Sequence, residues 1–176
     1  MVDVGKRIRI FDKQAETYEK KRMKQELGHL RRRLLHSAQG HVLELGVGTG
    51  ANFPYYRNDV ELTAVDFSPA MMNKARAAND RFYGLRITFI EGDVERLSLP
   101  ERSYDTIVST LSLCAYRNPE QVLRLMSRWC KPGGQILMME HGLGASKVVR
   151  FVQNMLDPLA YRIIGCHQNR DILDLV

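Results

Sequence analysis

The stretch Leu43-Glu44-Leu45-Gly46-Val47-Gly48-Thr49-Gly50-Ala51-Asn52 decides the fold. It begins as an apolar run typical of a β-strand and then places three glycines at alternate positions. Glycine after a strand lets the backbone turn tightly and leaves no Cβ between the backbone and a ligand. A plain turn needs one glycine or two, so three predict a loop that contacts a ligand. We expect a helix to follow this loop and to direct its free N–H groups into the same crevice.

Strands and helices alternate along the rest of the chain. This pattern predicts an α/β fold, a Rossmann-like, doubly wound, mostly parallel sheet in three αβα layers. In such a sheet, ligands bind outside the carboxyl ends of the strands. The expected strands are 41–45, 60–65, 87–90, 105–111 and 135–140, and the expected helices are 12–38, 69–81, 119–130 and 148–156.

The composition predicts one soluble globular domain. The chain has 176 residues, of which 44% are hydrophobic and 26% charged, and no apolar run is long enough to span a membrane. Its three cysteines form no CxxC pair and its five histidines no HExxH motif. We therefore expect reduced thiols, a cytoplasmic location and no metal site.

Residues 1–40 are expected to form an N-terminal helical segment or lid, and residues 41–176 the ligand-binding domain. In the helix predicted over 12–38, Met23, Leu27, Leu30 and Leu34 fall on one stripe that would pack inward. Residues 19–33 hold seven Lys or Arg against two Glu, within a net charge of +6. This segment is either a solvated helix face or a docking face for nucleic acid or an anionic membrane.

Acidic residues mark the ends of the first three strands. Asp66, twenty residues after Gly46, is placed to accept both hydroxyls of a ribose, Asp93 to accept from the exocyclic amine of a base, and Glu44 to face a cation. Each acid taken singly fits a cap or loop residue. Together they suit a cationic nucleoside better than a pyrophosphate, which needs donors and positive charge.

The segments LELGVGTG, VDFSPAMM, EGDVERLSLP, YDTIVSTLSL and KPGGQILMMEHG resemble, in order, the motifs of class I S-adenosylmethionine-dependent methyltransferases, over about residues 8 to 142. The resemblance implies S-adenosylmethionine as cofactor and S-adenosylhomocysteine as product. It assigns the glycines to the methionine part, Asp66 to the ribose, Phe67 and Met71 to the adenine, Asp93 to its amino group, and Thr110 and Leu111 to the transferring methyl. The full set of expected cofactor residues is Glu44, Gly46, Gly48, Gly50, Asn52, Asp66, Phe67, Met71, Asp93, Val94 (through its backbone N–H), Thr110 and Leu111.

A narrower likeness is carried by GTGANF, TLSLCAYRNP, MEHG and GCHQNRD. These segments are similar to the methyltransferase-like 7 group of membrane-associated thiol methyltransferases and to bacterial phospholipid N-methyltransferases of the ubiquinone/menaquinone type. The likeness implies a lipophilic substrate, either a phospholipid headgroup amine or a thiol. The basic segment 19–33 and the helix 148–156 would then rest at a lipid surface as a peripheral contact.

Methyl transfer from a sulfonium depends mainly on alignment of the acceptor, so a strong base is optional. His141 is the best base candidate, beside the alternative of a structural histidine. Tyr18, Cys114 and Tyr116 are the candidate substrate contacts. The fourth strand lacks the Asn/Asp-Pro-Pro-Tyr motif, which argues against methylation of DNA bases. An inactive cofactor-binding protein, a nucleic-acid methyltransferase and a nicotinamide oxidoreductase are the alternatives.

The family fold usually ends with two further strands after the fifth, and we expect both to be absent here, through truncation or another completion of the fold. The fifth strand would then leave an open apolar edge. Self-association through that edge is a further expectation.

Overall fold

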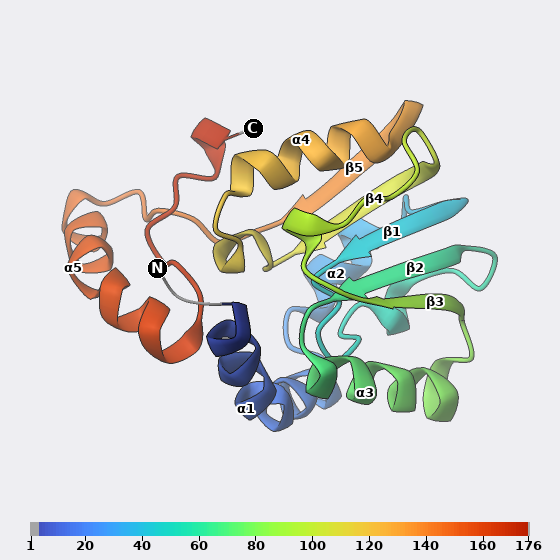
Figure 1. The fold of residues 1–176 in the computed structure, drawn as a ribbon, viewed down its shortest axis with the longest axis horizontal. Helices are drawn as coiled ribbons and strands as arrows, with labels where there is room; N and C mark the ends of the chain where they lie inside the picture. The colour runs from blue at the N-terminus through green and yellow to red at the C-terminus, as the bar shows by residue number, and fades with distance from the viewer. Residues whose placement is uncertain (1–3, 176) are drawn as a thin grey trace.

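The computed structural model describes residues 4–175 and contains a parallel sheet of five strands in the order β3-β2-β1-β4-β5 (Figure 1). The predicted α/β class is therefore confirmed. Strand order reverses between β1 and β4, which opens a crevice at their carboxyl ends. The strands are β1 His41–Leu45, β2 Glu61–Asp66, β3 Arg86–Glu91, β4 Tyr104–Thr110 and β5 Cys130–Met139.

Helices cover both faces of the sheet and make the three predicted layers (Figure 1). α2 (Gly28–Leu35) and α3 (Pro69–Ala78) lie on one face and α4 (Pro119–Trp129) on the other. α1 (Val4–Met23) and α5 (Lys147–Ile164) lie beyond the carboxyl ends of the strands (Figure 1). α3 begins at a capped end, because the Ser68 hydroxyl accepts from the backbone N–H of Met71 over 3.2 Å, and Pro69 follows at a position that needs no N–H.

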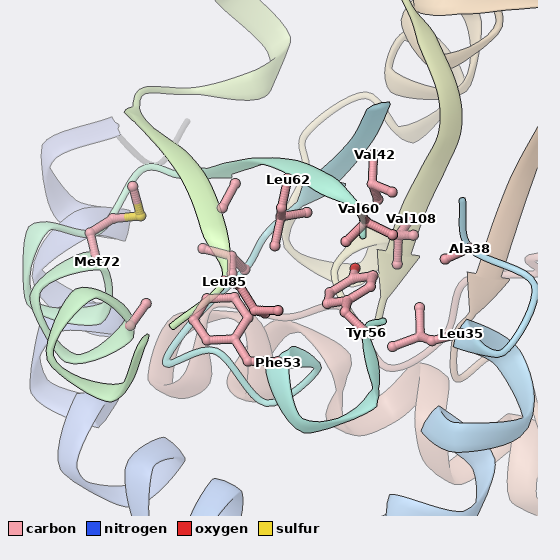
Figure 2. Close-up of a cluster of buried hydrophobic side chains, with 13 residues drawn as sticks. Leu35, Ala38, Val42, Phe53, Tyr56, Val60, Leu62, Met72, Leu85 and Val108 are labelled. Atoms are coloured by element: carbon pink, nitrogen blue, oxygen red, sulfur yellow. The ribbon is translucent and has the colours of Figure 1, made fainter. Parts of the chain in front are cut away.

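The first core cluster fills the space beneath α2 and α3 (Figure 2). Leu35 of α2 and Met72 of α3 pack against Val42, Leu62 and Val108 of three neighbouring strands. Successive residues of a strand point to opposite faces, so Leu43 and Ile107 instead pack under Met126 and Trp129 of α4. Burial on both faces explains the nearly continuous apolar runs of these strands.

The helix predicted over 12–38 is two helices, α1 and α2. Gln25 and Leu27 both adopt left-handed backbone conformations, with φ of 52° and 59°, and Gly28 begins α2. The prediction that a stripe of this helix packs inward is also wrong for Met23, Leu27 and Leu30, which are exposed. The break redirects α2, so Leu35 becomes its buried apolar contact.

β5 lies at an edge of the sheet, and within residues 4–175 no strand pairs with its outer side. The expectation of five strands is thus met in the described part of the chain. The helix predicted over 148–156 extends over the whole of α5. No helix among the described residues has both the length and the apolar character needed to cross a bilayer.

Candidate active site

A cavity of about 310 Å3 opens at the carboxyl ends of β1, β2 and β4. Its walls come from the glycine turn, from the residues that follow β2 and β4, from α1 and the turn between α1 and α2, and from the segment that ends α5. The predicted site residues that line it are Tyr18, Glu44, Gly46, Gly48, Asp66, Phe67, Met71, Thr110, Leu111, Cys114, Tyr116 and His141.

The glycine turn and the end of β2 are joined by one side chain. The carboxylate of Asp66 accepts from the backbone N–H of Gly48 over 2.8 Å and from that of Ser68 over 2.9 Å. Gly46 and Gly48 have φ of +68° and +56°, a conformation in which other residues are strained. Open space lies where a side chain of Gly48 would project. Burial raises the pKa of Asp66 to about 6, and these two N–H groups oppose that rise.

The helix expected to follow the glycine turn is absent from the described structure. A short 3-10 helix, Phe53–Tyr55, takes its place. The crevice therefore receives no long helix N-terminus from this side, and its polar groups are side chains and the N–H groups of the turn.

A second polar group lies behind the glycine turn, around the buried carboxylate of Glu44. This carboxylate accepts from Asn52 Nδ2 over 3.0 Å and from the Tyr56 hydroxyl over 2.9 Å. Burial raises its pKa to about 7, and the cation of Arg31 opposes the rise. The charge of Arg31 thus acts on Glu44 within the protein, and a role of Glu44 toward a cofactor stays a prediction.

Arg31 is a wall residue that the sequence pattern did not single out. Its Nη1 donates to Asn52 Oδ1 over 2.6 Å and to the Thr110 hydroxyl over 3.2 Å. Its Nε is buried without a hydrogen-bond partner. Only the break between α1 and α2 turns this arginine inward from the basic run 19–33, where most of the other cations are exposed.

The opposite end of the cavity holds the predicted substrate contacts. Cys114, in the 3-10 helix Leu113–Ala115, is buried beside Cys166 and His141. The Cys166 contact and burial raise the pKa of the Cys114 thiol, and the Cys114 contact raises that of His141. Tyr18 of α1 lies in the same wall, and burial raises its pKa.

The segment after α5 is held at this end by a partly buried contact between Asp157 and His167. Asp157, 7% exposed, contacts His167 Nδ1 over 2.8 Å and accepts from the backbone N–H of Gln168 over 2.6 Å. These bonds hold Cys166 and Gln168 in the cavity wall. The sequence alone does not indicate that Cys166 and Gln168 belong to the cavity wall, because Cys114 and Cys166 are far apart along the chain.

Four predicted cofactor residues lie outside the cavity wall: Gly50, Asn52, Asp93 and Val94. Asn52 supports Glu44 from behind, as described above. Asp93 caps the 3-10 helix Val94–Arg96 by accepting from the backbone N–H of Glu95 over 3.2 Å. Their roles toward a cofactor stay predictions.

No group of three His, Cys, Asp or Glu side chains in residues 4–175 is arranged to hold a metal ion. The cavity instead combines a buried carboxylate, a glycine turn and an apolar wall, at the switch point of a doubly wound sheet. A model of the methyltransferase domain family matches residues 42–134, which include the glycine turn, strands β2, β3 and β4, most of β1 and the first half of β5. The chain belongs to this family.

Two curated relatives are similar to this chain in sequence. The chain is 35% identical over 104 residues to phosphatidylethanolamine N-methyltransferase of Cereibacter sphaeroides, and the match covers 58% of this chain and 51% of that protein. It is 33% identical over 135 residues to human thiol S-methyltransferase TMT1A, covering 74% and 55%. The chain thus spans about half the length of these relatives.

One similar solved structure is a SAM-dependent methyltransferase from Thermotoga maritima. It matches 95% of this chain and 77% of its own, with a TM-score of 0.69 and 21% identity. At that identity the likeness shows the fold of the methyltransferase domain.

Proposed function

We propose that this chain transfers a methyl group from S-adenosylmethionine to a small lipophilic amine or thiol at a lipid surface. The observation that carries the proposal is the cavity itself. One end has the carboxylate of Asp66 and the glycine turn, and the other end has Tyr18, Cys114 and His141. The polar end would hold the cofactor and the other end the acceptor, side by side in one cavity.

The polar end of the cavity suits the cofactor. Each oxygen of Asp66 accepts one N–H bond, and a carboxylate has about four lone-pair sites, so both oxygens retain capacity for ribose hydroxyls. The unpartnered Nε of Arg31 needs an acceptor such as the carboxylate of an amino acid. Bound S-adenosylmethionine would supply a methyl group already activated by its positively charged sulfur.

The chain's own contribution to the reaction is alignment, exclusion of water and movement of one proton. Apolar walls bring the acceptor into line and keep water away, which in enzymes lowers the barrier by several kcal/mol. As the acceptor nitrogen or sulfur bonds to the methyl carbon, the carbon–sulfonium bond breaks and a neutral thioether leaves. His141 would take the proton that a thiol or ammonium acceptor loses, which its neutral imidazole can do.

A lipid surface is supported by the exposed side chains around the cavity mouth. Ile164 and Cys166, at the end of α5, line the cavity, and the helix itself exposes a large apolar surface made of Val148, Val149, Phe151, Val152, Met155, Leu156, Leu159 and Ile163. Across the mouth, Leu27 lines the cavity beside the exposed Met23 and Leu30.

The charged residues around the cavity mouth indicate which kind of lipid surface the protein would bind. α5 carries exposed Lys147, Arg150 and Arg162 among its apolar side chains, and the only acidic residue in α5, Asp157, is buried. The turn between α1 and α2 adds a basic groove lined by Lys24, His29, Arg32, Arg33 and His36. Apolar side chains flanked by cations fit an anionic lipid interface. The names of the two curated relatives support an amine or a thiol as the acceptor.

Calorimetry and methyl transfer test the activity. S-adenosylhomocysteine should bind and NAD should not. Radiolabelled methyl from S-adenosylmethionine should then enter either phosphatidylethanolamine in vesicles or an alkyl thiol. Binding without transfer to any fraction of a lipid and metabolite extract would favour a cofactor-binding protein without activity, and absence of binding would refute the proposal.

Co-sedimentation with phosphatidylglycerol vesicles at low salt tests the lipid surface. The parent protein should sediment with the vesicles, and Phe151→Glu with Met155→Glu should release it. The matched control Ser127→Glu changes an exposed residue of α4, away from the cavity mouth, and should sediment like the parent. If the α5 variant changes the oligomeric mass and leaves vesicle binding unaltered, a second copy covers this face and the lipid proposal is wrong.

A further inference from the structure

Gln168, in the segment after α5, is a wall residue of the cavity with an unused polar side chain. The structure gives its side-chain amide no hydrogen-bond partner among the described residues. The amide is also accessible, since it is not among the buried unpartnered atoms of residues 4–175. It keeps one oxygen that can accept and one nitrogen that can donate.

The backbone of Gln168 is fixed on both sides by α5. Its N–H donates to Asp157 Oδ1 over 2.6 Å, and its carbonyl accepts from Gln153 Nε2 over 2.9 Å. Asp157 and Gln153 are four residues apart and therefore neighbours on one helix face. The backbone groups of Gln168 are thus satisfied within the protein, and only its side chain is left for a ligand.

Gln153 also joins Gln168 to the base candidate of the site. Its Nε2 donates a second bond, over 3.3 Å, to the carbonyl of Gly142, the residue after His141. One amide nitrogen therefore holds the segment after β5 beside the segment after α5. This arrangement brings the backbone of Gln168 close to that of His141.

The same segment is bonded to the 3-10 helix that carries Cys114. The backbone N–H of His167 donates to the carbonyl of Cys114 over 3.0 Å, and Arg170 Nη1 donates to the carbonyl of Leu113 over 2.7 Å. Gln168 lies between these two donors in the sequence. It therefore belongs to the end of the cavity where the acceptor is expected.

This end of the cavity disfavours negative charge. The Cys166 contact and burial raise the pKa of the Cys114 thiol, and burial raises the pKa of Tyr18. A thiol acceptor in the same surroundings would also keep its proton, and a neutral thiol is a poor nucleophile. Burial has the opposite effect on an amine, because it favours the neutral form that carries a lone pair.

We propose that Gln168 binds the acceptor, with Oε1 accepting from an N–H of a neutral amine, and so selects an amine over a thiol. A thiol is a weak donor and would leave this amide without a strong partner. An ammonium acceptor first gives one proton to His141. Its lone pair then bonds to the methyl carbon as the carbon–sulfonium bond breaks, and the product leaves as a methylated ammonium ion. This inference rests on the proposed function, because it narrows the acceptor of the same reaction.

Methyl transfer to two acceptors of the same alkyl chain, hexylamine and hexanethiol, tests the inference. Gln168→Met keeps an unbranched side chain of similar length and removes the amide. It should lower kcat/KM for hexylamine about tenfold, as expected for the loss of one hydrogen bond. It should not lower kcat/KM for hexanethiol, and the affinity for S-adenosylhomocysteine should be unchanged. An equal fall with both acceptors would mean a merely structural role, and that result or no fall with hexylamine would overturn the inference.

The matched control is Gln39→Met, which changes an exposed glutamine before β1, at the opposite end of the strands, and should match the parent with both acceptors. If Gln168→Met fails to fold, the parent decides. With S-adenosylhomocysteine bound, it should bind hexylamine about tenfold more tightly than hexanethiol, and equal or reversed affinities would overturn the inference. So would transfer by the parent to hexanethiol alone, which leaves the proposed function intact. A parent that binds no S-adenosylhomocysteine, or transfers methyl to neither compound, counts against the proposed function instead.

Discussion

The backbone N–H of Gly48 donates to Oδ2 of Asp66 over 2.8 Å, and this bond fixes the glycine turn against the end of β2. The bond is possible because β1 and β2 run parallel in register, with Leu45 beside Val65, so that both strands end at the same edge. The loop that follows β1 therefore passes the last residue of β2.

Asp66→Asn should weaken the binding of S-adenosylhomocysteine by about ten- to a hundredfold, since hydrogen bonds to a charged group contribute about 1.5–3 kcal/mol each. The amide keeps the size of the side chain but loses the charge and one acceptor. Calorimetry at pH 8 measures the change, and a thermal scan checks that the variant is folded. Undiminished affinity would refute the assignment of Asp66 to the ribose.

The affinity of the parent for S-adenosylhomocysteine should fall as the pH falls through about 6. Burial raises the pKa of Asp66 to about 6, and only the ionised carboxylate accepts from two hydroxyls. Affinity is therefore full above this pKa and about tenfold weaker one pH unit below it. Asp66→Asn should bind weakly, with an affinity that does not change over the same pH range. This result would assign the pH dependence to Asp66 and not to Glu44.

Arg31→Ala should lower the free energy of unfolding at pH 8 by about 2 kcal/mol, because it leaves the buried Oδ1 of Asn52 without a donor. The Thr110 hydroxyl loses one of its two donors and keeps Asn52 Nδ2. Burial raises the pKa of Glu44 to about 7, so its contribution to stability is present at acid pH and is lost as the pH rises through 7. The loss in Arg31→Ala should then be smaller at pH 5.

Urea unfolding measures both values for Arg31→Ala. The exposed neighbour Arg33→Ala is the control and should change stability by less than about 0.5 kcal/mol. Glu44→Gln should recover part of the loss in the Arg31→Ala background at pH 8. No recovery would mean that Arg31 does not offset the charge of Glu44.

His141→Gln should lower the rate of methyl transfer about a hundredfold, within the range for loss of a general base, and should leave the affinity for S-adenosylhomocysteine unchanged. Hydrogen bonding to Cys114 raises the pKa of His141 above its usual 6.5, so the parent rate should rise with pH up to a point above 6.5. Single-turnover transfer of radiolabelled methyl measures the rate. An unchanged rate would make this histidine structural.

The open edge of β5 should allow self-association. Ile136 of this strand is 39% exposed, and Ile136→Lys places a charge there that disfavours pairing of edges. Light scattering at high concentration should show an oligomer for the parent and a smaller mass for Ile136→Lys. A strict monomer for the parent would contradict the prediction.

Much of the fold follows from local pattern. The strands and helices α3 and α4 were predictable because their apolar residues recur with the period of the element. The place of Asp66, Gly46 and Gly48 in the cavity wall was predictable because parallel strands end together. The prediction of one helix over 12–38 was wrong because hydrophobic periodicity does not detect two residues in the left-handed conformation. The sequence could not place Cys166, Gln168 and Arg31 in the cavity wall, because their positions depend on residues distant in the chain.

The amino-acid sequence by itself determined the layered sheet, the switch point and the acidic, glycine-rich end of the cavity, because these depend on short-range order and on strand direction. Only the tertiary structure decided which basic residues turn inward, which two cysteines meet and how α1 closes the cavity. Those outcomes depend on the angle at which α1, α2 and α5 pack across the strand ends. That angle is set by long-range contacts and by turns of two or three residues.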